Sequence, residues 1–250
     1  MVDTLTLATI FGTFLIAGTV KGVIGLGLPT VSLAFLTVAI DLPSAMTLLL
    51  IPSLVTNVWQ AAVGGNTSVV LRRIWPFLLM ATVTVWVGAI ALTRVDLSLL
   101  SALLGVLLVL YSILNLAGFR LTISTHQEVW AGPLIGAANG ILTGMTGSFV
   151  VPGVLFLQAI GLSRDMLIQA MGMLFTVSTM ALALALQENN FLTTRLGILS
   201  AAALMPAALG MAIGQHIRQN LSEQLFRQFF FMALLTLGTY IVGNAAYDLG

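Results

Sequence analysis

Two glycine-rich stretches carry the residue types best suited to holding a small anion. In the first, Gly22, Gly25 and Gly27 precede a proline, and in the second Gly144 and Gly147 do so. Glycine and proline interrupt a helix, and the helix that begins after the interruption exposes unpaired N–H groups with a partial positive charge. Two such N-termini, one in each stretch, would form an anion site whose backbone a ligand can approach closely.

Side chains near the two stretches add donors that suit the same ligand. Lys21, the only lysine, precedes the first break, whereas Thr143 occupies the matching position in the second stretch, which continues with Thr146 and Ser148. An ammonium group inside a membrane is costly without a partner, so an anionic substrate would be the natural partner of Lys21. If the break instead lies at the membrane surface, Lys21 is an ordinary cytoplasmic charge.

Polar residues elsewhere in apolar stretches form a second rank of candidates. Asn57 and Gln60 are three positions apart and share one helix face, and Thr176 and Thr179 hold comparable positions in the second half of the chain. Hydrogen bonding between helices is the alternative role for such residues. The complete candidate substrate-binding set is Lys21, Gly22, Gly25, Gly27, Thr30, Asn57, Gln60, Asn139, Thr143, Gly144, Thr146, Gly147, Ser148, Gln169, Thr176 and Thr179.

The residue types that are missing narrow the function further. Cysteine is absent, and the acidic residues, among them Asp41, Asp96 and Glu128, stand at the ends of apolar stretches or in expected loops. His126 and His216 also fall in expected loops and are too isolated to suggest a metal site. No nucleophile–base pair or carboxylate pair lies within an apolar stretch. The sequence therefore predicts no enzyme, metal site or cofactor, and proton coupling has no obvious carrier.

Composition places these residues in a membrane. Of 250 residues, 59% are hydrophobic and 7% are charged, whereas a soluble domain typically carries about 25% charged residues. A surface without a polar coat must face lipid, and a net charge of +1 gives no electrostatic case for nucleic acid. We therefore expect an all-α polytopic membrane protein whose partners are the lipid bilayer and a small anionic substrate, with homo-oligomers left open.

Ten charge-poor stretches are the elements that must position the candidate residues. A bilayer-spanning helix needs about 20 apolar residues; eight stretches can cross comfortably, and two, 28–40 and 149–161, are too short and read as half-helices or re-entrant arms. The ten stretches are 4–20, 28–40, 44–63, 74–93, 97–118, 129–147, 149–161, 166–187, 196–213 and 225–243.

The two short stretches occupy corresponding places in two halves, 1–120 and 121–250. Gly18, Gly22 and Gly25 recur 122 positions later as Gly140, Gly144 and Gly147. Internal repeats with interrupted hydrophobic segments are a mark of secondary transporters, whose binding sites lie at the interruptions near the midplane. Because each half has five segments, the second half is expected to be inverted relative to the first, with a glycine-rich helix break early in each half and the two breaks close together.

The distribution of basic residues supports this inverted arrangement. With the N-terminus outside, seven of nine basic residues fall on the cytoplasmic side and only Arg94 and Arg195 fall outside, as the positive-inside rule requires. Both termini are then outside. The seven cytoplasmic residues are Lys21, Arg72, Arg73, Arg120, Arg164, Arg218 and Arg227.

The glycine pattern resembles that of a known transporter family. The run Ala17-Gly18-Thr19-Val20-Lys21-Gly22-Val23-Ile24-Gly25-Leu26-Gly27-Leu28-Pro29, with its second copy at 139–147 leading to Pro152, is similar to the TauE/SafE family of sulfite and organosulfonate exporters. The resemblance covers nearly the whole chain and implies export of sulfite or a related sulfur anion across the bacterial inner membrane. Lys21, Leu28 and Phe149 depart from the family's usual pattern. An anion channel or a transporter of another small organic anion is the alternative.

Overall fold

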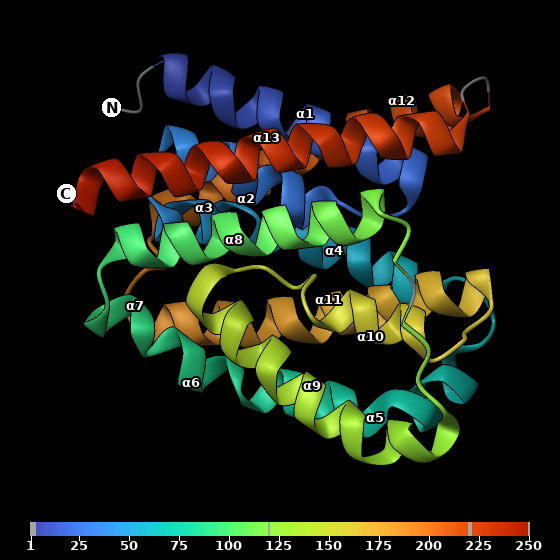
Figure 1. The fold of residues 1–250 in the computed structure, drawn as a ribbon. Coiled ribbons are helices and arrows are strands. Elements are labelled where there is room, and N and C mark those ends of the chain that lie inside the picture. Colours follow the sequence, from blue (N-terminus) through green and yellow to red (C-terminus); the bar gives the residue numbers. More distant parts are fainter. Residues whose placement is uncertain (1–3, 120, 220–221, 250) are drawn as a thin grey trace. The chain divides into compact units, whose positions relative to one another are not determined.

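The computed structural model describes residues 4–119, 121–219 and 222–249, and every regular element in these ranges is a helix. The predicted all-α fold is therefore confirmed. Figure 1 shows the helices in chain order. They are α1 (Thr4–Ile24), α2 (Leu28–Ala39), α3 (Leu42–Leu48), α4 (Leu50–Ala62), α5 (Thr67–Val83), α6 (Val85–Ala89), α7 (Ala91–Arg94), α8 (Leu97–Leu116), α9 (Thr125–Thr146), α10 (Gly153–Ala159), α11 (Arg164–Glu188), α12 (Thr194–Arg218) and α13 (Glu223–Leu249).

Several of these helices are long and apolar enough to cross a bilayer. Within the described residues six helical stretches meet this condition, and a seventh does so if α3 and α4, which meet at a 44° bend, are counted as one span. The bend has a local cause, because Pro52 lies in the first turn of α4 and cannot donate to the carbonyl of Leu48. The chain is a multi-pass membrane protein.

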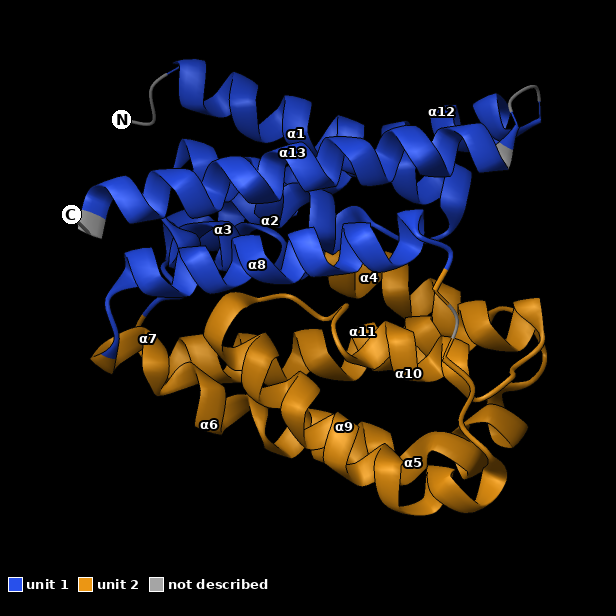
Figure 2. Ribbon diagram, viewed as in Figure 1, with its two compact units in different colours: residues 1–52, 95–118, 191–250 blue, residues 53–94, 119–190 orange. Residues whose placement is uncertain are grey.

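Two compact units divide the helices between them (Figure 2), and neither coincides with a half of the sequence. Unit 1 comprises residues 1–52, 95–118 and 191–250, and so holds α1, α2, α3, α8, α12 and α13. Unit 2 comprises residues 53–94 and 119–190, and so holds most of α4 together with α5, α6, α7, α9, α10 and α11. Each unit thus combines helices from both halves of the chain.

Unit 1 is built around the crossing of α1 and α12. A Cβ atom on Gly18 would overlap the carbonyl oxygen of Ala207, and one on Gly22 would overlap that of Met211. From the opposite helix, a Cβ on Gly214 would lie 3.0 Å from the Cα of Gly22. Small residues let two backbones approach closely in lipid, where van der Waals packing is the main attraction between helices. The glycine spacing in α1 therefore sets how closely α12 packs.

Unit 2 contains a crossing of the same kind between α9 and the α5–α6 segment. A Cβ on Gly140 would lie 2.6 Å from the carbonyl oxygen of Ala81, and one on Gly144 would overlap the carbonyl oxygen of Val85. A Cβ on Gly88 would in turn lie 3.0 Å from the Cα of Gly144. The glycine ladder of α9 thus has a packing role in addition to the substrate role expected of Gly144.

Several expected loops are helical. Arg72 and Arg73 lie in the second turn of α5, His126 in the first turn of α9 and His216 in the last turn of α12, so their placement in loops was wrong. Polar residues continue these helices beyond their apolar stretches because caps stabilise the added turns, as the capping box of Ser124 does for α9. Arg120, also expected in a cytoplasmic loop, lies outside the described residues.

The short segment of the second half is shorter than expected. It was predicted to occupy 149–161, but α10 begins only at Gly153 and has seven residues. Between Gly147 and Pro152 the chain forms a buried non-helical loop. Pro152 is the N-cap residue of α10. Because proline has no N–H to donate to an earlier turn, a helix cannot continue through it without losing a hydrogen bond but can begin just after it. The first half has the longer segment, the twelve-residue α2.

Candidate functional site

The first glycine break lies in unit 1 between α1 and α2. Gly25 and Gly27 have φ angles of 84° and 110°, which L side chains rarely adopt. The N–H of Gly25 donates to the carbonyl of Lys21 at 2.7 Å, and Gly27 is the N-cap residue of α2. A helix leaves its first amides without intrahelical partners, so the start of α2 has the polarity expected of an anion site, with Pro29 contributing no donor.

Lys21 and Thr30 flank this break and are both buried, with 4% and 2% of their surfaces exposed. Lys21 lies in the last turn of α1, between the two glycines that pack on α12. A loop charge obeying only the positive-inside rule would extend into solvent. The burial of Lys21 therefore favours the interpretation in which its ammonium group belongs to the interior of the protein.

The second break lies in unit 2, where α9 ends at Thr146 and Gly147 takes a left-handed conformation. The hydroxyl of Thr143 donates to the carbonyl oxygen of Ser148 at 3.0 Å, and the N–H of Ser148 donates to the hydroxyl oxygen of Thr146 at 3.2 Å. The N–H of Gly147 donates to the carbonyl of Thr143 at 2.7 Å. The N–H groups of Gly147 and Ser148, expected to face an anion, are therefore engaged within the break itself.

Asn139 connects the second break to the start of α10. Its Oδ1 accepts a hydrogen bond of 2.8 Å from the N–H of Gly153, which fixes the first residue of α10 against α9. The side chain is fully buried, and its Nδ2 has no hydrogen-bond partner among the described residues. A buried donor without a partner costs about 1–3 kcal/mol, so this amide is suited to a ligand acceptor.

The second-rank candidates have mostly structural contacts. Gln169 uses its whole amide: Nε2 donates to the carbonyl of Ala61 and to the hydroxyl of Thr67, both at 2.8 Å, and Oε1 accepts from the N–H of Asn66 at 3.1 Å. Gln60 donates to the carbonyl of Ile168 at 2.8 Å. These bonds tie α11 to α4 and the turn after it, which is the interhelical alternative.

The remaining candidates of this rank lie in α4 and α11. The hydroxyls of Thr176 and Thr179 donate to carbonyls one turn back in α11, at 2.7 and 2.6 Å. Asn57 is fully buried in α4. The structure thus groups Lys21, Gly22, Gly25, Gly27 and Thr30 in unit 1, and the other eleven candidates in unit 2.

Sequence reasoning missed one cluster, an ion pair between Arg73 of α5 and Glu128 of α9 that also contacts the end of α10. The two residues are 55 positions apart, and the sequence predicts them as unrelated charges at the ends of different apolar stretches. It also missed Ser53 and Ser178, fully buried hydroxyls of unit 2 without a hydrogen-bond partner among the described residues. The spacing of residues along the sequence gives no indication that links Ser53 with Ser178.

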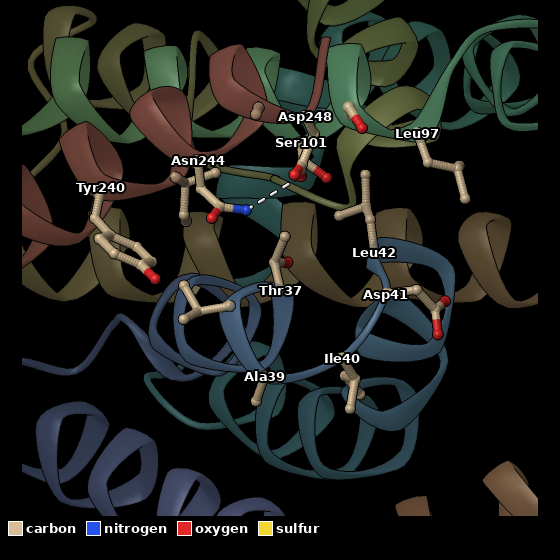
Figure 3. Close-up of a pocket in the computed structure, with 14 residues that line it drawn as sticks. Thr37, Ala39, Ile40, Asp41, Leu42, Leu97, Ser101, Tyr240, Asn244 and Asp248 are labelled. Carbon is tan, nitrogen blue, oxygen red and sulfur yellow. Dashed lines mark hydrogen bonds between the residues drawn. The ribbon is translucent and has the colours of Figure 1, made fainter. Parts of the chain in front are cut away.

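A pocket of about 330 Å³ lies elsewhere, at one end of unit 1 (Figure 3). It is lined where α2 ends, where α3 and α8 begin and along the last turns of α13, and Asn244 donates to Asp248 on its wall at 3.3 Å. Asp41 and Asp248 are its charged residues, and no candidate site residue lines it. Its carboxylates repel anions, so the pocket does not fit the predicted substrate.

Comparison with known proteins identifies the family. The chain matches the family model described as sulfite exporter TauE/SafE over residues 10–241, which is nearly its whole length. No curated protein and no solved structure matches it. The chain belongs to the TauE/SafE family, and it is a multi-pass membrane protein of a family that transports sulfur-containing anions.

Proposed function

We propose that this protein exports sulfite or an organosulfonate from the cytoplasm across the bacterial inner membrane, and that anion-binding groups lie at the glycine breaks. The candidate binding groups are Lys21 and the first turn of α2 at one break, and at the other the amide of Asn139, positioned beside the loop that follows α9. Family membership supports the substrate class. The observation that carries the site is the buried amide of Asn139, a donor with no partner in the described part of the chain, beside broken helix backbone.

The proposed topology places both termini outside. Figure 1 shows the beginning of α1 and the end of α13 at the same end of unit 1, which supports termini on one side of the membrane. The natural absence of cysteine allows single cysteines to be placed at exposed Thr122 and Asn190. We expect an impermeant thiol reagent added to intact cells to label Asn190→Cys and to leave Thr122→Cys unlabelled. Labelling of Thr122→Cys would overturn the topology.

Transport itself can be tested in sealed vesicles of opposite orientation. Inside-out vesicles should accumulate sulfite or a small sulfonate, with sulfate and thiosulfate as comparison substrates. An exporter should saturate with substrate and show counterflow, whereas an anion channel should show no counterflow. Lack of transport for every anion of this panel would contradict the proposal.

The role of Asn139 has a conservative test. Asn139→Asp keeps the acceptor for the Gly153 N–H but replaces the unpaired donor by an oxygen that repels anions. We expect substrate affinity to fall at least tenfold, equivalent to about 1.4 kcal/mol. The matched control is Asn115→Asp in α8, because the Nδ2 of Asn115 already donates to the carbonyl of Tyr111 at 2.9 Å. Equal effects of the two variants on affinity would remove Asn139 from the site.

A further inference from the structure

The missed ion pair in unit 2 joins three helices. Arg73 of α5 donates from Nε to Oε1 of Glu128 at 2.8 Å and from Nη2 to Oε2 at 2.9 Å. The same Nη2 donates to the carbonyl oxygen of Ile160 at 2.6 Å. Glu128 lies in the first turn of α9, and Ile160 is the C-cap residue of α10. One guanidinium therefore connects α5, α9 and α10.

Other bonds make α10 a segment held at both ends. At its start, Gly153 donates to Asn139. At its end, the carbonyl of Ala159 accepts from the N–H of Ile123 at 2.9 Å, and Ile160 accepts from Arg73. Gly161 follows in a left-handed conformation, with φ of 69°, and redirects the chain into α11. A helix of only seven residues has little stability of its own, so these end contacts decide where it lies.

The chemistry of the pair explains why arginine is needed. Glu128 is 9% exposed, and a carboxylate with so little access to water needs a charged partner with matching geometry. The planar guanidinium supplies two parallel donors to the carboxylate and a further one to the carbonyl, which a lysine ammonium cannot reproduce. Arg72, which is also exposed, lies one position before Arg73 in the same turn of α5 and so provides a matched residue of the same charge.

We propose that Arg73 is a positioning residue for anion transport: with Glu128 it holds the end of α10, and through α10 it sets the conformation of the loop between Gly147 and Pro152. The inference rests on the proposed function, since it treats that loop as part of the anion site. The corresponding positions of unit 1, by the offsets that relate the two helix crossings, are Leu199 and Thr6, which cannot form an ion pair. The ion pair of Arg73 with Glu128 is therefore a feature of the second break.

The first test measures transport kinetics in vesicles. Arg73→Gln and Glu128→Gln should each raise the KM for the transported anion about tenfold, because a small displacement of binding groups has a large effect on the bound geometry. Arg73→Lys should be intermediate. Arg72→Gln removes the same charge from the same turn and should leave KM unchanged. A rise in KM for Arg72→Gln equal to that of Arg73→Gln would overturn the positioning role.

The second test does not depend on transport. A single Val150→Cys, at a buried position of the loop, is combined with each variant, and its rate of alkylation by a small maleimide is measured in membranes. We expect the rate to rise about tenfold with Arg73→Gln or Glu128→Gln and to stay at the parent value with Arg72→Gln. The reference is Leu104→Cys, buried in α8 of unit 1.

The two readouts separate the failure of this inference from the failure of the proposed function. If no anion of the panel is transported by the parent protein, the proposed function fails while the alkylation test still decides whether Arg73 positions the loop. An unchanged rate at Val150→Cys in both Arg73→Gln and Glu128→Gln would overturn the inference. An equal rise at Leu104→Cys would also overturn it, because the ion pair would then stabilise the whole fold rather than position the loop.

Discussion

The two units solve the same packing problem with residues at constant separations in the sequence. In unit 1, Gly18 and Gly22 of α1 meet α12; in unit 2, Gly140 and Gly144 of α9 meet α5 and α6. The glycines of the second pair stand 122 positions after those of the first. Their partners, Ala207 and Met211 in α12 and Ala81 and Val85 in α5 and α6, are separated by 126 positions.

The correspondence extends to unlike residues. Gly210 approaches the carbonyl oxygen of Leu15 in unit 1, and at the matching place in unit 2 the hydroxyl of Thr84 donates to the carbonyl of Ala137 at 2.9 Å. Such paired contacts at two fixed offsets are what the predicted internal repeat would produce. Each unit pairs the first helix of one half with the fourth segment of the other.

The breaks that follow the two crossings differ in their polar groups. Unit 1 has a buried lysine and a twelve-residue helix after the break. Unit 2 has hydroxyls and an amide around a loop, followed by seven helical residues. Under the proposed function, the similar crossings serve stability and the different breaks serve anion recognition.

The largest effect is expected where the crossings are tightest. Gly22→Ala and Gly144→Ala each place a Cβ on backbone atoms of the facing helix, and such overpacking costs about 1–3 kcal/mol or more. Their matched controls are Gly12→Ala in α1, where a Cβ has no neighbour within 4 Å, and Gly132→Ala in α9, where the nearest atom lies at 3.4 Å. Thermal stability in detergent is the measurement, and controls as unstable as the crossing variants would contradict this account.

An effect confined to binding, with no loss of the fold, is expected from Lys21. Its counterpart at the 122-residue offset is Thr143, so only the first break carries an amine at this position. Losing a charge-assisted hydrogen bond costs about 1.5–3 kcal/mol, and Lys21→Met should therefore weaken anion affinity about ten- to a hundredfold with normal membrane insertion. Lys21→Arg should retain part of the affinity. Binding titration of purified protein checks this, and unchanged affinity in Lys21→Met would reduce Lys21 to a topology signal.

The smallest effect is expected at Thr143. Thr143→Val removes the hydroxyl that holds the carbonyl of Ser148, and a neutral hydrogen bond contributes about 0.5–1.5 kcal/mol. Affinity should fall by less than about tenfold. Thr82→Val is the matched control, since its hydroxyl donates to the carbonyl of Leu78 in its own helix at 2.7 Å and Thr82 is not a candidate site residue. If the two valine variants bind equally well, the bond within the second break has no part in recognition.

The outline of the fold could be predicted because a membrane helix is recognisable from the hydropathy of its own residues. A run of about 20 apolar residues reports burial in lipid residue by residue, and the stretch 97–118 accordingly matches α8 within two residues. Helix ends were less predictable, since Arg72, Arg73 and His216 continue helices that hydropathy alone would have ended. Capping and propensity decide those turns, and neither depends on apolar character.

The sequence by itself determined the helical membrane fold, the interruption of helices at Gly25, Gly27 and Gly147, and the family resemblance. It could do so because glycine conformation and hydropathy are local properties. Only the tertiary structure decided which helices pair within each unit. It also decided that the Gln169 amide donates to Ala61 and Thr67 and that Arg73 forms an ion pair with Glu128. These contacts join residues 55 to 108 positions apart. Their partners are chosen by helix packing across the fold, which no single stretch of sequence records.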